Sequence, residues 1–344
     1  MGKRLLILNT DDKECAYGGI CPFMRNMHPF LADSFIVDYL VLPNSWKKMP
    51  GPVRFYYLVY LLLNFYKFGK FDFILSHAVE GSYVSSFTKI PYAHIYHGNS
   101  NPVEFSRFSY GKYFMGLYEM MFRRIERTAS ILYSVGPLRN EKQKKLFNPL
   151  IQNIKPLPVN ERKGFVFAGR LEIVKNIDRL ISLYSKLPLE IRKENAFYII
   201  GFGTLDSKLK QFVHTLNMTD YIFFLGKVDN SQMMKVISDK RVMLMASSTE
   251  GFPTAIAEAF SVGLPIVTTN VGDIRSIVRD KFNGRLLESD YSDNEYIDCI
   301  KDVLDNYDSY AQKAFETSKF FDCENITRDV VCDILSVINK KSNG

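Results

Sequence analysis

Two cations in the second half of the chain have the types and spacing of a phosphate site. In "FAGRLEIVKNIDRLI", Arg170 ends a strand-like run and Lys175 follows five residues later, at the start of a helical pattern. Arginine donates two parallel hydrogen bonds to a phosphate, and lysine adds a point charge. A lysine near a helix N-terminus opposes the helix dipole by about 0.3–1 kcal/mol unless an anion is present. This cost favours an anion site over the alternative of two ordinary surface cations.

Two glutamates further along the chain have the chemistry to bind hydroxyl groups. Glu250 and Glu258 lie eight residues apart in "SSTEGFPTAIAEAFSVGLPIVTT", residues 247–269. Carboxylates only accept hydrogen bonds, so their natural partners are hydroxyls. A sugar nucleotide, with phosphates in the middle and a polyhydroxy ring at each end, would place one ring at each glutamate. The alternative is a helix-start carboxylate and a solvated one, but Glu258 lies among small and apolar residues, where an unpaired carboxylate is costly.

The backbone between these glutamates is expected to face the phosphates. Proline is favoured at the first helical position, so Pro253 predicts that a helix begins there. The N–H groups around Gly251, Phe252 and Thr254 would then be free to donate to an anion. Glu250 would stand beside the anion rather than in its site.

Glycines follow two other strand-like runs. "YGGI" places Gly18 and Gly19 after the first run, where the backbone could approach a pyrophosphate. "GFGTLD" places Gly203 after a later run, but Asp206 stands where a dinucleotide fingerprint requires its third glycine. A nicotinamide cofactor is therefore not indicated, and Gly203 is assigned to the donor-binding residues.

Histidines end two neighbouring runs in the first half, at His77 and His97. A histidine at a strand end is more often a hydrogen-bonded structural residue than a catalytic one. Gly98 and Asn99 open the backbone into a loop after His97, which favours this histidine as a site residue. The sequence has no D-x-D, H-x-x-x-H or C-x-x-C motif, so no metal site is expected.

The elements that position these residues alternate along the whole chain. Short β-rich apolar runs are separated by helix-length segments, which predicts parallel sheets covered by helices. The runs are 4–10, 35–42, 71–77, 92–98 and 129–136 in the first half, and 164–170, 196–203, 221–226, 241–247, 264–270 and 284–288 in the second. A proline-containing linker separates the halves, so two doubly wound α/β domains are expected. Ligands of such sheets lie beyond the carboxyl ends of the strands, where the residues above are found.

The composition indicates a globular chain that is long enough for two hydrophobic cores. It has 344 residues, of which 47% are hydrophobic. Five cysteines form no C-x-x-C pair, so reduced thiols are expected. Neither a leader with a basic start and an apolar centre nor a run of 18 apolar residues is found. These features predict a cytoplasmic chain that does not span the membrane.

Together, "GRLEIVKN", "STEGFPTAIAEAFSVGLPIVTTNVGDI" and the early glycine pair resemble family 4 of the retaining GT-B glycosyltransferases. The resemblance is strong over residues 160–290 and looser before them. It implies a GT-B fold, in which two Rossmann-like domains face across a cleft, and a nucleotide-sugar substrate with no cofactor or metal. It also implies an acceptor-binding domain of residues 1–155 plus a returning C-terminal helix at about 322–344, and a nucleotide-sugar-binding domain of residues 156–321.

The resemblance implies a role for each residue of the second domain. Arg170 and Lys175 would neutralise the diphosphate, and Glu258 would hold the ribose hydroxyls. Glu250, with the backbone of residues 251–254, would hold and orient the transferred sugar rather than attack it. The anomeric configuration would be retained.

The resemblance assigns residues of the first domain as well. His97 matches the family's strand-end histidine, which lies close to the donor sugar and the reaction centre, and His94 and His77 are weaker matches. Gly18 and Gly19 match the phosphate-side loop, although the preceding run "TDDKECAYGGI" is longer and more acidic than in many members.

Two features bear on the acceptor: the net charge of the first half of the chain, and the acceptors that the family resemblance implies. Residues 1–160 carry 20 Lys and Arg against 11 Asp and Glu, a net charge of +9, whereas the rest carries 24 against 26, or −2. Segments 53–71 and 111–128 join aromatic and aliphatic residues to basic ones. They could rest on an anionic membrane at its inner face, or be core-facing helices with solvated basic ends. The resemblance implies a UDP- or GDP-sugar donor and a glycan or lipid-linked acceptor in bacterial surface polysaccharide assembly.

Two other classes of function remain open at this stage. A non-enzymatic nucleic-acid binder would use the basic first half, but it leaves the paired glutamates unexplained, and no recognition helix or stacking motif is found. A GT-B sugar-nucleotide epimerase or phosphorylase would share the fold, and the phosphorylase would need a pyridoxal lysine or inorganic phosphate.

Overall fold

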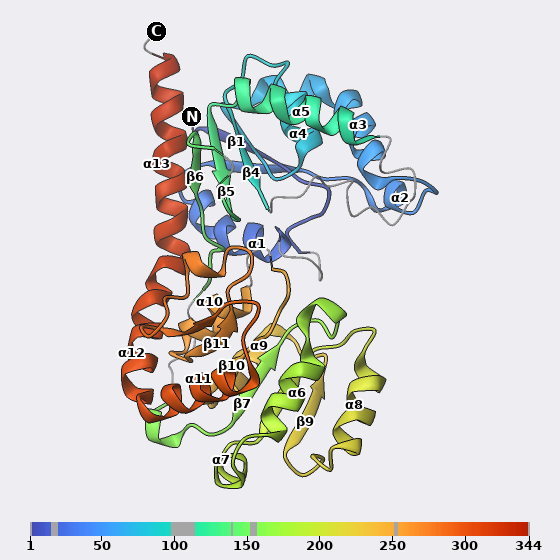
Figure 1. Ribbon diagram of the computed structural model, residues 1–344. Helices are drawn as coiled ribbons and strands as arrows, with labels where there is room; N and C mark the ends of the chain where they lie inside the picture. The colour runs from blue at the N-terminus through green and yellow to red at the C-terminus, as the bar shows by residue number, and fades with distance from the viewer. Residues whose placement is uncertain are drawn as a thin grey trace. The chain divides into compact units, whose positions relative to one another are not determined.

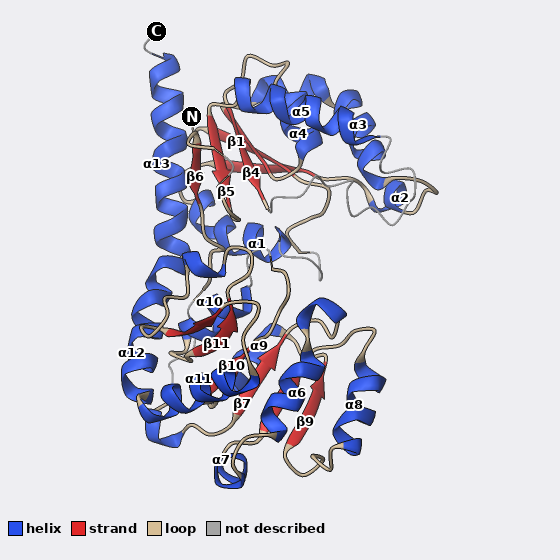
Figure 2. Ribbon diagram, in the orientation of Figure 1, coloured by secondary structure: helices blue, strands red, loops and turns tan. Residues whose placement is uncertain are grey.

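The computed structural model describes residues 2–14, 20–97, 114–138, 140–151, 157–250 and 254–342. The chain divides into two compact units. The N-terminal unit contains Met1–Ile151 and Asp322–Gly344, and the C-terminal unit contains Gln152–Phe321. Within the described residues, each unit is built on one parallel sheet with helices around it (Figures 1 and 2).

The sheet of the N-terminal unit has the strand order β2-β1-β3-β4-β5-β6, and every neighbouring pair is parallel. Its strands are β1 (Arg4–Leu8), β2 (Ile36–Leu40), β3 (Phe73–Ser76), β4 (Tyr92–Tyr96), β5 (Ile131–Ser134) and β6 (Gln143–Lys145). All residues of β3, β4 and β5 are buried. Burial on both faces is expected of parallel strands, since crossover helices cover both sides of the sheet.

The helices of this unit are α1 (Ile20–Ala32), α2 (Asn44–Lys47), α3 (Val53–Leu63), α4 (Val79–Ser85), α5 (Met115–Thr128) and α13 (Cys323–Ser342), with a 3-10 turn η1 (Phe65–Lys70). Helices α3, α4 and α5 lie together, and α4 packs against both of the others (Figure 1). The C-terminal helix α13 packs against α1. Asp333 of α13 accepts a hydrogen bond from Tyr133 of β5 at 2.8 Å, so the end of the chain completes the N-terminal unit.

The sheet of the C-terminal unit has the order β12-β11-β10-β7-β8-β9, again with parallel pairs throughout. Its strands are β7 (Phe165–Ala168), β8 (Phe197–Ile200), β9 (Ile222–Gly226), β10 (Val242–Leu244), β11 (Ile266–Thr269) and β12 (Gly284–Leu287). Its helices are α6 (Ile177–Ser185), α7 (Leu189–Glu194), α8 (Asp206–Thr215), α9 (Asn230–Ser238), α10 (Thr254–Ser261), α11 (Asp293–Asp305) and α12 (Tyr307–Ser318). The aromatic side chains of Phe165, Phe167, Tyr184 and Phe197 are fully buried in its core.

Each sheet has a point at which its strand order reverses. In the C-terminal unit the chain proceeds from β7 outward through β8 and β9, and then returns to the other side of β7 as β10. In the N-terminal unit the reversal lies between β1 and β3. Crossover helices leave such neighbouring strands on opposite faces of the sheet, and open α/β sheets generally bind their ligands at the carboxyl ends of these strands.

The predicted class of two doubly wound α/β domains is confirmed, and each of the eleven predicted strand-like runs contains a strand. Strand β6 was missed, because Gln143–Lys145 is a short polar run at the sheet edge with no apolar signal. The expectation of reduced thiols is wrong for Cys21, which is disulfide-bonded. The other cysteines that the structure describes, Cys299, Cys323 and Cys332, are free.

Candidate functional site

The candidate site of the C-terminal unit lies at the carboxyl ends of two strands that flank the reversal point. Strand β7 leads into Gly169 and Arg170, and then into a 3-10 turn η4 (Ile173–Lys175). Strand β10 pairs with β7 and leads towards Ser247 and Glu250. The topology thus brings together two segments that are about 75 residues apart in the sequence.

Lys175, Glu250 and Ser247 form one polar cluster at this point. Lys175 Nζ donates to Glu250 Oε1 at 2.5 Å, and Ser247 Oγ donates to the same oxygen at 2.7 Å. The Lys175 side chain is 16% exposed and that of Glu250 is 7% exposed. An ammonium group has three donors, so Lys175 keeps two for other acceptors while it holds Glu250.

The backbone around the cluster is fixed by several bonds between the two strand-end segments. Asn176 adopts the left-handed conformation, with φ 47° and ψ 47°, and its Nδ2 donates to Ala246 O at 2.8 Å. Asparagine tolerates this conformation better than most residues. Ser248 N donates to Val174 O at 2.9 Å, and Thr269 Oγ1 donates to Ser247 O at 2.6 Å. The cluster is therefore held from three strand ends, those of β7, β10 and β11.

Arg170 lies on the same loop after β7 as Lys175, but it differs from Lys175 in its exposure and in its contacts. Its side chain is exposed, and no hydrogen bond or ion pair joins its guanidinium to another described residue. An unpaired guanidinium fork at the end of β7 can bind a phosphate bidentately. The loop after β7 thus carries two cations: Lys175, which is paired with Glu250, and Arg170, whose side chain is exposed and pairs with no other described residue.

Gly203 lies where the loop after β8 packs closely against the loop after β7. A Cβ atom on Gly203 would lie 2.3 Å from Leu171 O, and one on Gly201 would lie 1.8 Å from Gly169 O. Gly201 also has φ +138°, a conformation that L side chains rarely adopt. The close packing of the two loop backbones thus requires glycine at both positions, independently of any contact with a ligand.

Glu258 lies on α10, a helix with a strongly apolar face. Ile256, Ala257 and Phe260 are fully buried, whereas Glu258 is half-buried. Thr254 is the first residue of α10 and is also half-buried. The predicted amide donors of Gly251 and Phe252, and the predicted helix start at Pro253, lie outside the described residues.

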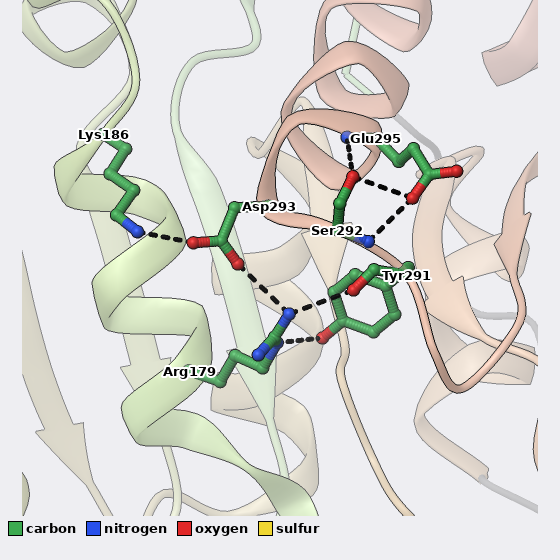
Figure 3. A network of polar contacts seen from close by, with 6 residues as sticks. All are labelled: Arg179, Lys186, Tyr291, Ser292, Asp293 and Glu295. Atoms are coloured by element: carbon green, nitrogen blue, oxygen red, sulfur yellow. Dashed lines mark hydrogen bonds and ion pairs between the residues drawn. The ribbon is translucent and has the colours of Figure 1, made fainter.

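Helix α6, which begins directly after Asn176, is anchored on α11. Arg179 of α6 donates to the hydroxyl of Tyr291 at 2.9 Å and to its carbonyl at 3.1 Å, and Asp293 accepts from both Arg179 and Lys186 (Figure 3). Ser292 and Glu295 complete a capping box at the start of α11. These exposed contacts join the start of α11 to α6, the helix that follows Lys175.

The predicted histidines of the N-terminal unit lie at the carboxyl edge of its sheet. His77 follows β3 and His97 follows β4, and Nδ1 of His77 is 2.8 Å from Nε2 of His97. Their ring planes are inclined by 25°, with 5.1 Å between the centroids, so the rings meet edge to edge through these nitrogens. Burial lowers the pKa of His97 to about 3, and burial together with His97 and His94 holds the pKa of His77 well below its usual value. Gly18 and Gly19 lie outside the described residues.

Sequence reasoning overlooked two partners in these clusters. Ser247 precedes Glu250 by three residues, a spacing at which a hydroxyl can return to a carboxylate in a turn. The pairing of His77 with His97 left no local signal, because the residues end separate strands. Among the described residues, no group of three or more His, Cys, Asp or Glu side chains could hold a metal ion.

Comparison with known proteins gives a match for the part of the chain that holds the cation and glutamate cluster. Residues 151–318 match the family model described as Glycosyl transferases group 1. The chain is 30% identical over 126 residues to the N-acetyl-alpha-D-glucosaminyl L-malate synthase of Bacillus anthracis, which covers 37% of this chain and 32% of that protein. It is 32% identical over 116 residues to the O-antigen chain mannosyltransferase B of Escherichia coli, which covers 33% of this chain and 30% of that protein. The chain thus matches about a third of the length of these relatives.

Solved structures resemble the chain over almost its whole length. A sucrose-phosphate synthase from Thermosynechococcus elongatus matches with a TM-score of 0.77 at 15% identity, covering 98% of this chain and 100% of that chain. The HepE protein of Anabaena in complex with UDP matches with a TM-score of 0.70 at 18% identity, covering 97% and 100%. At these identities the likeness shows the fold, which confirms the predicted GT-B class.

Proposed function

We propose that this protein is a retaining glycosyltransferase of family 4, which moves a sugar from a nucleotide diphosphate sugar to a hydroxyl group of an acceptor. The observation that carries this proposal is the cluster of Lys175, Glu250 and Ser247 at the point where the strand order of the C-terminal sheet reverses. The cluster lies within residues 151–318, which match the model of group 1 glycosyl transferases. The HepE structures contain UDP or UDP-glucose, which supports a UDP-sugar as the first donor to test.

In the proposed complex the donor lies along the strand ends of the C-terminal unit. Arg170 and Lys175 bind the diphosphate, and Glu258 accepts hydrogen bonds from the ribose hydroxyls. Glu250 accepts from a hydroxyl of the transferred sugar, since its second oxygen, Oε2, is not used by Lys175 or Ser247. The remaining proposed contacts belong to the loop residues Gly18, Gly19, Gly203, Gly251, Phe252, Pro253 and Thr254, and to His97 near the reacting carbon.

The proposed chemistry is mainly electrostatic. The bond between the anomeric carbon and the phosphate oxygen breaks while the acceptor hydroxyl attacks on the same face of the sugar. The proton of that hydroxyl passes to the leaving phosphate. Negative charge grows on the diphosphate as the bond breaks, and fixed cations that already point at it stabilise this transition state. Arg170 and Lys175 supply that charge, so the proposed reaction needs no metal.

The proposed acceptor is a lipid-linked glycan reached through the N-terminal unit. Large apolar side chains are exposed to solvent on and beside the adjoining helices α3, α4 and α5: Phe55, Leu62 and Leu63 on α3, Tyr66 in η1, Phe87 after α4, and Leu117 on α5. Basic side chains lie among them, and Arg124 stacks over the ring of Phe87 at 4.0 Å. Exposed apolar groups with basic neighbours match the interface of an anionic bilayer. None of the helices in the described part of the chain has the length and apolarity to cross a bilayer.

The membrane contact is tested with lipid vesicles. The purified protein is expected to bind vesicles rich in anionic lipid at low salt and to bind neutral vesicles much less. Changing both Leu62 and Leu63, which are 57% and 63% exposed, to serine is expected to weaken binding by at least tenfold, because each inserted leucine contributes about 1.5–3 kcal/mol. Leu189→Ser, at an exposed leucine of the C-terminal unit, is the matched control. Equal binding of wild type and the double variant would contradict the proposed surface.

The donor is tested by thermal denaturation with UDP-, GDP- and ADP-sugars, each with and without EDTA. A ligand at a hundredfold excess over its Kd stabilises the folded state by about 2.7 kcal/mol, so the true donor is expected to raise the Tm clearly. EDTA is expected to leave this rise unchanged. Failure of every nucleotide sugar to shift the Tm would contradict the proposal, and a shift by pyridoxal phosphate or oligonucleotides would favour a phosphorylase or a nucleic-acid binder.

A further inference from the structure

The pair formed by His77 and His97 has a property that neither histidine has alone. A neutral imidazole carries one N–H and one bare nitrogen. The nitrogens that face each other, Nδ1 of His77 and Nε2 of His97, are 2.8 Å apart. A hydrogen bond at this distance requires a hydrogen on one of them and a lone pair on the other. The two residues therefore share one tautomer, either Nδ1–H in both or Nε2–H in both, and fixing one fixes the other.

The surroundings of the pair hold both rings in place. Phe23 of α1 meets the two rings edge-on, with centroid distances of 5.5 Å to His77 and 5.1 Å to His97. Phe23 is itself buried, and the backbone N–H of His77 donates to Leu8 O at 2.9 Å. His94, the other histidine nearby, is bonded to Ser82 Oγ at 2.7 Å. Neither ring of the pair can turn away without losing the contact between Nδ1 and Nε2 and the edge contacts with Phe23.

The difference in exposure between the two residues favours one nitrogen of the pair as the donor. In either arrangement one ring N–H is left without a partner among the described residues. If His77 donates, the spare N–H is Nδ1–H of His97, and if His97 donates, it is Nε2–H of His77. A polar hydrogen without a partner costs less where water or a ligand can reach it. His77 is only 7% exposed, whereas His97 is partly exposed, so the arrangement with His77 as donor is favoured.

We propose that His77 is a positioning residue that donates its Nδ1–H to Nε2 of His97 and thereby holds His97 in the Nδ1–H tautomer. His97 then presents a hydrogen-bond donor, not an acceptor, to its ligand. A donor at this position suits an oxygen-rich ligand, such as a sugar hydroxyl or a phosphate oxygen. The role of His97 towards a sugar donor rests on the proposed function, whereas its tautomer does not.

The tautomers are measured without any substrate, by long-range ¹H–¹⁵N NMR of the imidazole nitrogens. The chain has five histidines, so His28→Gln, His94→Gln and His214→Gln variants assign the remaining signals. In the wild type at neutral pH, Nδ1 is expected to carry the hydrogen in both His77 and His97, and Nε2 of both to be bare. A hydrogen on Nε2 of His97 would overturn the proposal.

Two substitutions at position 77 separate the effect of the N–H donor of His77 from the effect of its planar ring. His77→Asn retains an N–H near the position of Nδ1 and is expected to keep His97 in the Nδ1–H tautomer. His77→Phe retains a planar ring without the N–H and is expected to shift His97 towards the Nε2–H tautomer or a mixture. An unchanged His97 tautomer in a folded His77→Phe variant would overturn the proposal, and the wild-type spectrum decides the matter if that variant does not fold.

Transfer assays with the donor found by thermal denaturation connect the tautomer to turnover. His77→Phe is expected to lower kcat at least tenfold with a smaller change in the donor KM, and His77→Asn to recover most of it. If the NMR result holds but His97→Ala transfers sugar normally, the coupling of the two rings stands and the proposed role of His97 is wrong. If His77→Phe shifts the tautomer and kcat does not change although His97→Ala is inactive, the positioning role is overturned.

Discussion

Lys175→Ala is expected to lower kcat by about 10²–10³-fold, the usual loss when a group that stabilises transition-state charge is removed. Lys175 has a fixed place in the 3-10 turn after β7, since Glu250 accepts its hydrogen bond at 2.5 Å and its side chain is only 16% exposed. A water molecule in its place would have to reorganise as charge grows on the leaving diphosphate. Steady-state transfer kinetics with the identified donor measure the effect.

The fold of the Lys175→Ala variant has to be checked, because the substitution leaves the buried Glu250 carboxylate without its cation. Breaking a buried ion pair costs about 3–5 kcal/mol, although Ser247 still donates to this carboxylate. A double variant, Lys175→Met with Glu250→Gln, removes both charges and is expected to be as stable as the wild type within about 1 kcal/mol while remaining inactive. Urea denaturation compares the three proteins.

Lys186→Ala is the matched control for Lys175→Ala. Lys186 also makes an ion pair at 2.5 Å, to Asp293 (Figure 3), but its side chain is 52% exposed. Exposed ion pairs contribute about 0–1 kcal/mol, so this variant is expected to match the wild type in stability and turnover. Near-normal turnover of Lys175→Ala would count heavily against the assigned site, and an equal loss in both variants would show a general effect of surface charge.

Glu258→Ala is expected to weaken turnover through donor binding, with the KM for the nucleotide sugar raised about 10–100-fold. A hydrogen bond to a charged group contributes about 1.5–3 kcal/mol, and each 1.4 kcal/mol is a factor of ten. Glu258 lies on α10 in a half-buried position next to buried Ala257 and Ala259. Initial rates over a range of donor concentrations separate this rise in KM from a change in kcat.

A donor that carries 2′-deoxyribose tests whether Glu258 binds the ribose itself. The wild type is expected to lose affinity for this donor, whereas Glu258→Ala should bind both donors alike, because the carboxylate that distinguishes them is gone. Glu316→Ala, on the surface of α12, serves as the control and is expected to discriminate as the wild type does. Discrimination that survives in Glu258→Ala would place the ribose contact elsewhere.

Apart from β6, the strands of both sheets were predictable from local pattern alone. A run such as "FVFA" in β7 is apolar at every position, as a strand buried on both faces must be, and the helix pattern after it follows within a few residues. Arg170, Lys175, Glu250 and Glu258 were predicted as site residues in the same way, because their residue types and spacing are local features. The apolar stripe of α6 is likewise buried at Ile177, Leu180, Ile181 and Tyr184.

The sequence by itself therefore determined the fold class and indicated the residues that we propose to bind a diphosphate and its sugars, since strand periodicity, helix starts and short motifs are encoded over about ten residues. Only the tertiary structure decided that Lys175 meets Glu250 and Ser247, because that contact depends on β10 returning to the side of β7. It also decided that His77 faces His97, and that the polar run Gln143–Lys145 forms an edge strand. The order of strands in a sheet is set by packing of the whole domain, and no local pattern in the chain carries it.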